Sequence, residues 1–83
     1  MQEFPVLQSE DIDKLYTRIG KNVKKAREDA GLTQLELSLI LGHKSVSLIS
    51  RAEIFHKNVH FNIEHLAKIA FALDVDIIEF FKQ

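Results

Sequence analysis

The stretch Thr33–Glu53 constrains the fold of this chain more than any other part of the sequence. Thr33 is a favourable helix N-cap, and Glu36, three residues later, completes the pattern of a capping box. Gly42 follows and can end the helix, because glycine accepts a positive φ without strain. Between them, three apolar residues have the spacing of one buried helical face: Leu37, Ile40 and Leu41.

A second short helix is predicted after the turn formed by residues 43–45. Ser45 is the expected cap of this helix, and Ile49 and Ala52 are its expected buried residues. Two short helices joined by a turn that contains glycine form a helix-turn-helix, whose second helix typically enters the major groove of DNA.

The rest of the chain is also predicted to be helical. Ser9 is the expected cap of a long helix that runs to about Ala30, where Gly31 ends it. One apolar stripe follows that helix: Ile12, Leu15, Tyr16, Ile19, Val23, Ala26 and Ala30. Its off-stripe lysines and arginines form either a solvated face or contacts to phosphate.

A fourth helix is predicted to begin after Asn62 and to stop at Asp74. Asp76 and Glu79 repeat the capping-box pattern and open a last short helix over residues 77–81. No alternating strand pattern competes with these helices. The expected fold is therefore an all-α, compact five-helix domain with a central helix-turn-helix, over residues 9–83.

Residues 1–8 are expected to form an N-terminal arm, because Pro5 disfavours a helix there. The arm is either a frayed tail that drapes over the domain or an element exchanged in a dimer. The chain has 83 residues and no cysteine, so it holds one domain without a disulfide. It lacks the pattern of a signal peptide and the roughly 18 apolar residues of a membrane span, which predicts a cytoplasmic protein without a membrane partner.

Charge is distributed unevenly along the chain, although the net charge is only −1. Residues 14–68 contain ten Lys or Arg and five Asp or Glu, an excess of +5, while both ends are acidic. Local charge decides attraction to phosphate within a Debye length of about 10 Å. The basic middle, which contains the helix-turn-helix, therefore favours a double-stranded DNA partner and salt-dependent binding.

An ordered set of residues resembles the Cro/CI-type helix-turn-helix family, the lambda-repressor-like DNA-binding domain. The matching positions are Ile19-Gly20, Arg27, Gly31-Leu32-Thr33-Gln34, Leu37, Leu41-Gly42, Ile49-Ser50-Arg51, Glu53, Leu66, Ala70, Ala72-Leu73 and Phe80. The resemblance covers roughly residues 12–81. The turn is one residue longer than usual in the family, and the loop after Glu53 is about two residues longer and lacks the usual glycine.

The resemblance implies roles for particular residues. The base-reading positions would be Val46, Ser47, Ser50 and Arg51. Of these only Arg51 can read guanine with two hydrogen bonds, so sequence preference would lean on DNA shape, unless the serines are only a solvated face. Phosphate contacts are expected from Gln34, Lys44, Ser45 and Lys57. For Gln34 the alternative is a helix-start residue without a partner.

Two further pairs have expected structural roles. Arg27 and Glu53 would form a partly buried ion pair between the first helix and the recognition helix. Adjacent Phe80 and Phe81 cannot both enter one small core, so Phe80 is expected inside. Phe81 and Ile78 would then form a homodimer interface, unless Phe81 packs beneath the arm against Phe4 or Leu7.

Other chemistry has little support in the sequence. The four histidines, His43, His56, His60 and His65, lack cysteine partners and the HExxH pattern, so no metal is expected. No nucleophile motif and no phosphate-binding glycine loop is present, so neither an enzyme nor a cofactor is expected. The predicted function is a transcriptional regulator, such as a phage repressor or restriction-modification controller. The alternative is the antitoxin of a toxin–antitoxin pair, with the arm facing the toxin.

Overall fold

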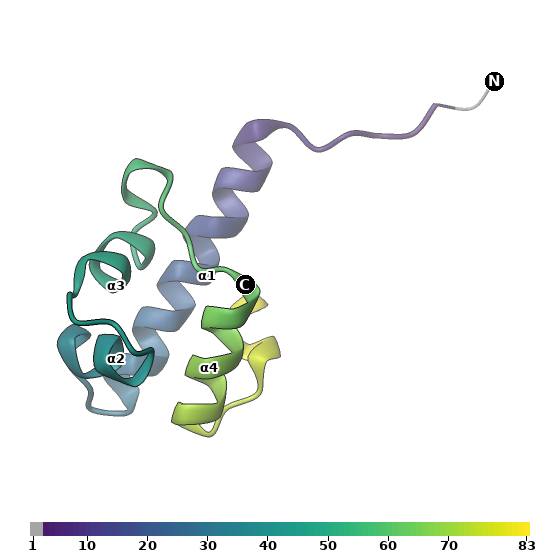
Figure 1. Ribbon diagram of the computed structural model, residues 1–83. Coiled ribbons are helices and arrows are strands. Elements are labelled where there is room, and N and C mark those ends of the chain that lie inside the picture. The colour runs from purple at the N-terminus through teal and green to yellow at the C-terminus, as the bar shows by residue number, and fades with distance from the viewer. Residues whose placement is uncertain (1–2) are drawn as a thin grey trace.

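The computed structural model describes residues 3–83, and within this range the chain is entirely helical, with no strand (Figure 1). It has four α-helices and two short 3-10 segments. Their bounds are α1 Ser9–Asp29, α2 Gln34–Ile40, α3 Ser47–Ala52, η1 His56–Asn58, α4 Ile63–Leu73 and η2 Ile77–Phe81. The expected last helix therefore has the predicted bounds but 3-10 geometry. No helix of the described residues is long and apolar enough to cross a membrane.

Helix ends follow the capping patterns, with one correction. The Thr33 hydroxyl accepts a hydrogen bond from the Glu36 amide, and the Glu36 carboxylate accepts one from the Thr33 amide, which confirms the predicted capping box. The predicted cap at Ser9 is wrong, because α1 begins one residue earlier than that cap allows. The cap is Gln8, whose amide donates to the Asp11 carboxylate.

The core lies where α1, α2, α3, α4 and η2 meet. Its buried apolar residues are Ile19, Val23, Leu37, Leu41, Ile49, Ala52, Phe61, Leu66, Ile69, Ala70 and Phe80. The prediction of a buried Ile40 is wrong, because 46% of its surface is exposed. Ser38 is buried instead, and its hydroxyl donates to the Gln34 carbonyl, which removes the cost of burying it unpaired.

Gly20 is the point of closest approach between α1 and α3. A Cβ atom at this position would overlap the carbonyl oxygen of Ala52 and lie 2.9 Å from that of Glu53. Only a residue without a side chain lets the two helix backbones come this close. Gly20 therefore sets how α3 is seated on α1.

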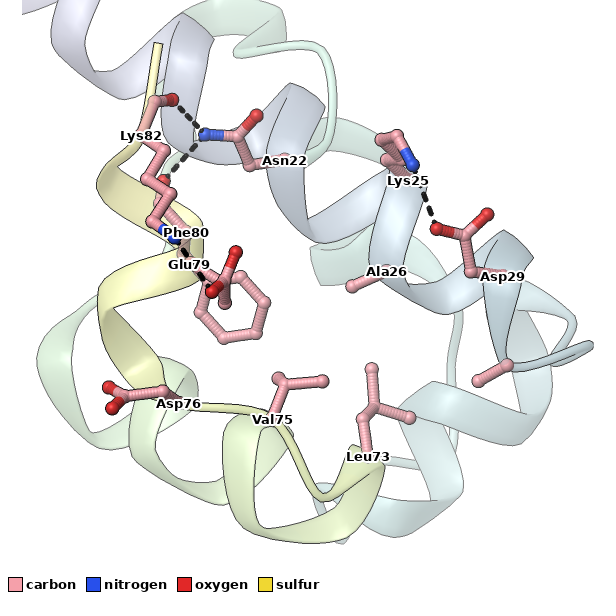
Figure 2. A pocket seen from close by; sticks show the side chains of 11 residues that line it. Asn22, Lys25, Ala26, Asp29, Leu73, Val75, Asp76, Glu79, Phe80 and Lys82 are labelled. Atoms are coloured by element: carbon pink, nitrogen blue, oxygen red, sulfur yellow. Dashed lines mark hydrogen bonds and ion pairs between the residues drawn. The ribbon is translucent and has the colours of Figure 1, made fainter.

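The C-terminal segment η2 lies against α1. Asp76 caps it by accepting a hydrogen bond from the Ile78 amide, while Glu79 pairs with Lys82 at 2.9 Å rather than completing a capping box. The Asn22 side-chain amide of α1 donates to the carbonyls of Phe80 and Lys82, as Figure 2 shows. These bonds hold the end of the chain on α1, with the Phe80 ring inside as predicted.

The N-terminal arm, of which residues 3–8 are described, is extended and leads away from the helices (Figure 1). Phe4 and Leu7 are 80% and 68% exposed, so neither covers the aromatic residues near the C-terminus. Phe81 itself is 37% exposed. The alternative in which Phe81 packs beneath the arm does not occur in this structure.

Candidate nucleic-acid interface

The turn between α2 and α3 begins with a regular helix stop. Leu41 is the C-cap of α2, Gly42 follows with a φ of 82°, and the His43 amide donates to the Ser38 carbonyl at 2.9 Å. The positive φ at Gly42 turns the chain sharply away from the helix axis. Residues 42–46 then lead into α3 without further regular structure.

The start of α3 differs from the prediction by one residue. The helix begins at Ser47, and its N-cap is Val46, whose backbone is already in the helical region. Ser45 lies one residue before the cap, but its hydroxyl still accepts a hydrogen bond from the Ser47 amide at 3.1 Å. Ser45 thus satisfies a free amide at the helix start without being the cap itself.

Helix α3 has a buried face and an exposed face. Ile49 and Ala52 are completely buried against the rest of the domain. Ser47 and Arg51 are exposed and Ser50 is half-buried, so the side of α3 that faces away from the core carries polar groups. Two of its hydroxyls have local partners, because Ser50 donates to the Ser47 carbonyl and Ser47 contacts the Ser45 hydroxyl.

A buried ion pair ties α3 to α1. Arg27 of α1 donates to both carboxylate oxygens of Glu53, from Nε at 2.7 Å and from Nη2 at 3.1 Å. The Arg27 Nη1 atom donates to the Leu32 carbonyl at 2.7 Å. Only 10% and 1% of the two side chains are exposed, and the hydrogen bonds from Glu53 raise the pKa of Arg27. The expected ion pair is therefore present, with the two-bond geometry that makes Arg–carboxylate pairs strong.

Gln34 joins this pair to α2. Its side-chain amide donates to the Glu53 Oε1 atom at 2.9 Å. Glu53 thus accepts hydrogen bonds from α1 and from α2, and three helices converge on one buried carboxylate. The predicted phosphate contact from Gln34 would have to use the second amide hydrogen, because the first is already donated.

The basic side chains around α3 have no internal partners. Lys44, Arg51 and Lys57 are exposed and form no ion pair within residues 3–83. Lys44 precedes α3 and Lys57 follows it in the loop, so the sequence places one free cation on either side of Arg51. Such cations are available for an anionic ligand.

The loop after α3 has an unusual backbone. Phe55, Lys57 and Asn58 all have positive φ angles, of 52°, 51° and 65°. Aromatic stacking holds the loop on α1, since the Tyr16 ring stacks on Phe55 at 5.6 Å and on His60 at 3.9 Å between centroids. The loop therefore has a fixed seat despite the absence of the glycine usual in the resembling family.

The histidines do not form a metal site. No group of three metal-ligating side chains exists within the described part of the chain. His65 instead closes the N-terminal capping box of α4, where its Nδ1 accepts a hydrogen bond from the Asn62 amide at 3.1 Å. Burial, followed by nearby His43, lowers the pKa of His65. The two rings lie edge to face at 6.0 Å, between the helix-turn-helix and α4.

Sequence reasoning missed two of these features. The Gln34–Glu53 bond was not foreseen, although a polar residue at the first position of α2 and a buried acid are the elements such a bond needs. The capping role of His65 was also missed, although its place three residues after Asn62 is the signal of a capping box. Comparison of the chain with protein-family models and with curated proteins finds no match.

Proposed function

We propose that this protein is a sequence-specific DNA-binding transcriptional regulator of the lambda-repressor-like type, which reads the major groove with α3 as a homodimer. A repressor or autoregulator is the form that a single small domain without a separate sensing module favours. The observation that carries the proposal is the seating of α3. Its inner face is fixed by Ile49, Ala52 and the Arg27–Glu53 pair, while Arg51 points away from the core without a partner.

Rigid presentation of α3 supports a role in recognition. A helix that reads bases must not shift against its own domain, since a small displacement breaks contacts of fixed geometry. Glu53 lies directly at the C-terminal end of α3 and binds groups from α1 and α2, so the end nearest to Arg51 is held from two sides.

The exposed groups around α3 suit a duplex. In this proposal Arg51 donates two hydrogen bonds to a guanine edge, and Val46, which is 37% exposed, touches a thymine methyl group. Ser47 and Ser50 supplement these contacts, while Lys44, Ser45, Gln34 and Lys57 bind phosphates. With one strong base-reading side chain, DNA shape has to contribute to the preference.

The dimer part of the proposal rests on the C-terminal segment. Ile78 and Phe81 are 59% and 37% exposed, next to the buried Phe80. Apolar side chains that remain exposed beside a core often mark an interface. A two-fold dimer would present its two copies of α3 to half-sites about 34 Å apart, one turn of DNA.

Selection of bound sequences from a random DNA pool tests the proposal, followed by binding of Arg51→Ala to the selected and to a scrambled duplex. We expect Arg51→Ala to weaken specific binding by about 1–3 kcal/mol with the fold intact. Lys68→Ala, which removes an exposed lysine of α4, is the matched control and should bind normally. Failure to enrich any sequence contradicts the proposal, and an equal loss on both duplexes would assign Arg51 to phosphate.

A second candidate function is an antitoxin-type protein-binding module with secondary DNA binding. Phe71 of α4 favours it, because 91% of this large apolar side chain is exposed. Ile63 lies two turns earlier on the same helix and is 68% exposed. Co-purification with the product of the neighbouring gene tests this function, and Phe71→Ser should abolish it while DNA binding persists.

A further inference from the structure

A groove of about 610 Å³ lies between the C-terminal half of α1, the end of α4 and η2. Figure 2 shows four apolar side chains that point into it, Ala26, Leu73, Val75 and Phe80. The charged groups at its rim are already paired, Lys25 with Asp29 and Lys82 with Glu79. The unsatisfied property of this groove is therefore its half-buried apolar surface.

The N-terminal arm has the complementary problem. Phe4, Val6 and Leu7 are 80%, 77% and 68% exposed, and none belongs to the core or packs against it. Pro5 keeps the segment extended, and the bond from the Gln8 side chain to the Val6 carbonyl is local. Three large apolar side chains on six extended residues gain nothing from folding until they meet a second surface.

The arm cannot reach the groove of its own chain. Asn22, the groove residue of α1 nearest to the arm in sequence, lies roughly 20 Å from Ser9 along the helix at 1.5 Å per residue. Even if it turned straight back, the segment from Gln8 to Phe4 would span only about 13 Å at about 3.3 Å per residue. The apolar floor lies farther still, beside Ala26.

The hollow that the arm could reach has the wrong chemistry. It lies along the N-terminal half of α1 and is lined by polar and charged residues, among them Glu10, Asp13, Lys14 and Arg18. Burying Phe4 or Leu7 there would desolvate charges without apolar contact in return. An apolar arm and an apolar groove in one chain that cannot meet within it are able to meet between two chains.

We infer that the N-terminal arm of one copy occupies the groove between α1, α4 and η2 of a second copy, so that the dimer forms by arm exchange. This inference deepens the proposed homodimer and rests on it. The arm then adds to the interface at Ile78 and Phe81, because η2 both carries these residues and walls the groove. An exchanged pair of arms would bury six large apolar side chains that the single chain exposes.

The absence of cysteine from the sequence allows a direct cross-linking test. Val6→Cys marks the arm, Ala30→Cys marks the groove, and Ala67→Cys marks the exposed stripe of α4 as a matched control. Equal mixtures of two singly substituted proteins are oxidised and separated without reductant. We expect a mixed disulfide between Val6→Cys and Ala30→Cys and none with Ala67→Cys, since the Cα atoms must come within about 7 Å.

Two outcomes of the cross-linking would overturn the inference. One is an equal yield with Ala67→Cys, which would seat the arm on α4 or show random collision. The other is an intrachain disulfide in the doubly substituted Val6→Cys/Ala30→Cys protein, which would show that the arm folds back on its own chain.

Sedimentation equilibrium supplies an independent measurement. The triple variant Phe4→Ser/Val6→Ser/Leu7→Ser changes only exposed residues and should keep its helical circular dichroism. Its dimer dissociation constant should rise roughly tenfold or more, because the apolar area buried by both arms is lost. An unchanged dissociation constant, together with a loss in Phe81→Ser, would overturn arm exchange while retaining the proposed dimer. A monomeric wild type would overturn both, and DNA selection would still test α3 separately.

Discussion

The buried Arg27–Glu53 pair gives the most direct quantitative test of how α3 is held. In Arg27→Ala, the Glu53 carboxylate loses two of its three side-chain hydrogen bonds and keeps only the bond from Gln34. Glu53 is 2% exposed, so water cannot replace the lost donors without opening the domain. In Glu53→Ala, the guanidinium keeps only the Leu32 carbonyl.

The expected loss follows from stranding one charge. Breaking a buried pair by removing one partner costs about 3–5 kcal/mol, mainly because the remaining charge is desolvated without compensation. The free energy of unfolding of a small domain is about 5–15 kcal/mol, so either single variant should lose a large share of its stability. The double variant strands no charge and should lose clearly less than the sum of the two single losses.

Urea unfolding followed by circular dichroism measures this double-mutant cycle. The exposed Lys25–Asp29 pair on the same helix provides a matched control, since its side chains are 76% and 66% exposed. Its cycle should give a coupling of about 0–1 kcal/mol. Additive losses at Arg27 and Glu53, or a coupling no larger than in the control, would refute the reasoning that this pair locks α3 to α1.

Three further predictions test separate parts of the structure. Gly20→Ala should lower the free energy of unfolding by about 1–3 kcal/mol in urea melts, because its methyl group meets the backbone of Ala52 and Glu53; wild-type stability would contradict the close approach. The pKa of His65 lies below its ordinary 6.5 in the folded chain. The unfolded chain therefore binds more protons, and stability should be constant above about pH 7 and fall as the pH drops below about 6.5. His65→Gln should flatten that fall, and an unchanged pH profile would exclude the capping histidine as its cause. Phe81→Ser should weaken the dimer in sedimentation equilibrium while helicity persists, and a wild type that stays monomeric at high micromolar concentration would contradict this expectation.

Local patterns were sufficient wherever the deciding interaction is short in sequence. The Thr33–Glu36 capping box, the positive φ at Gly42 and the stop of α4 at Asp74 involve neighbouring residues only, and each could be predicted. The same holds for the choice between adjacent Phe80 and Phe81, since one short segment can direct only one of them inward.

The expected site was predictable in part. The Arg27–Glu53 pair could be expected because an arginine and an acid occur at matching positions of a resembling family. The start of α3 could not be fixed, because Ser45, Val46 and Ser47 all suit a helix start and the longer turn leaves their register open. Whether α3 binds DNA remains a proposal that the selection experiment has to test.

Tertiary packing decided what the local pattern left ambiguous. In the short helix α2, both Ile40 and Ser38 lie beside Leu37 and Leu41, and the position of the neighbouring helices buries Ser38 and leaves Ile40 half-exposed. Gln34 met Glu53 only because Gly20 lets α3 approach α1. Sequence by itself determined the helices, their caps and the charged pair, because these depend on spacing along the chain. The folded structure alone decided which faces are buried and where the arm can reach, because these depend on distances between residues far apart in sequence.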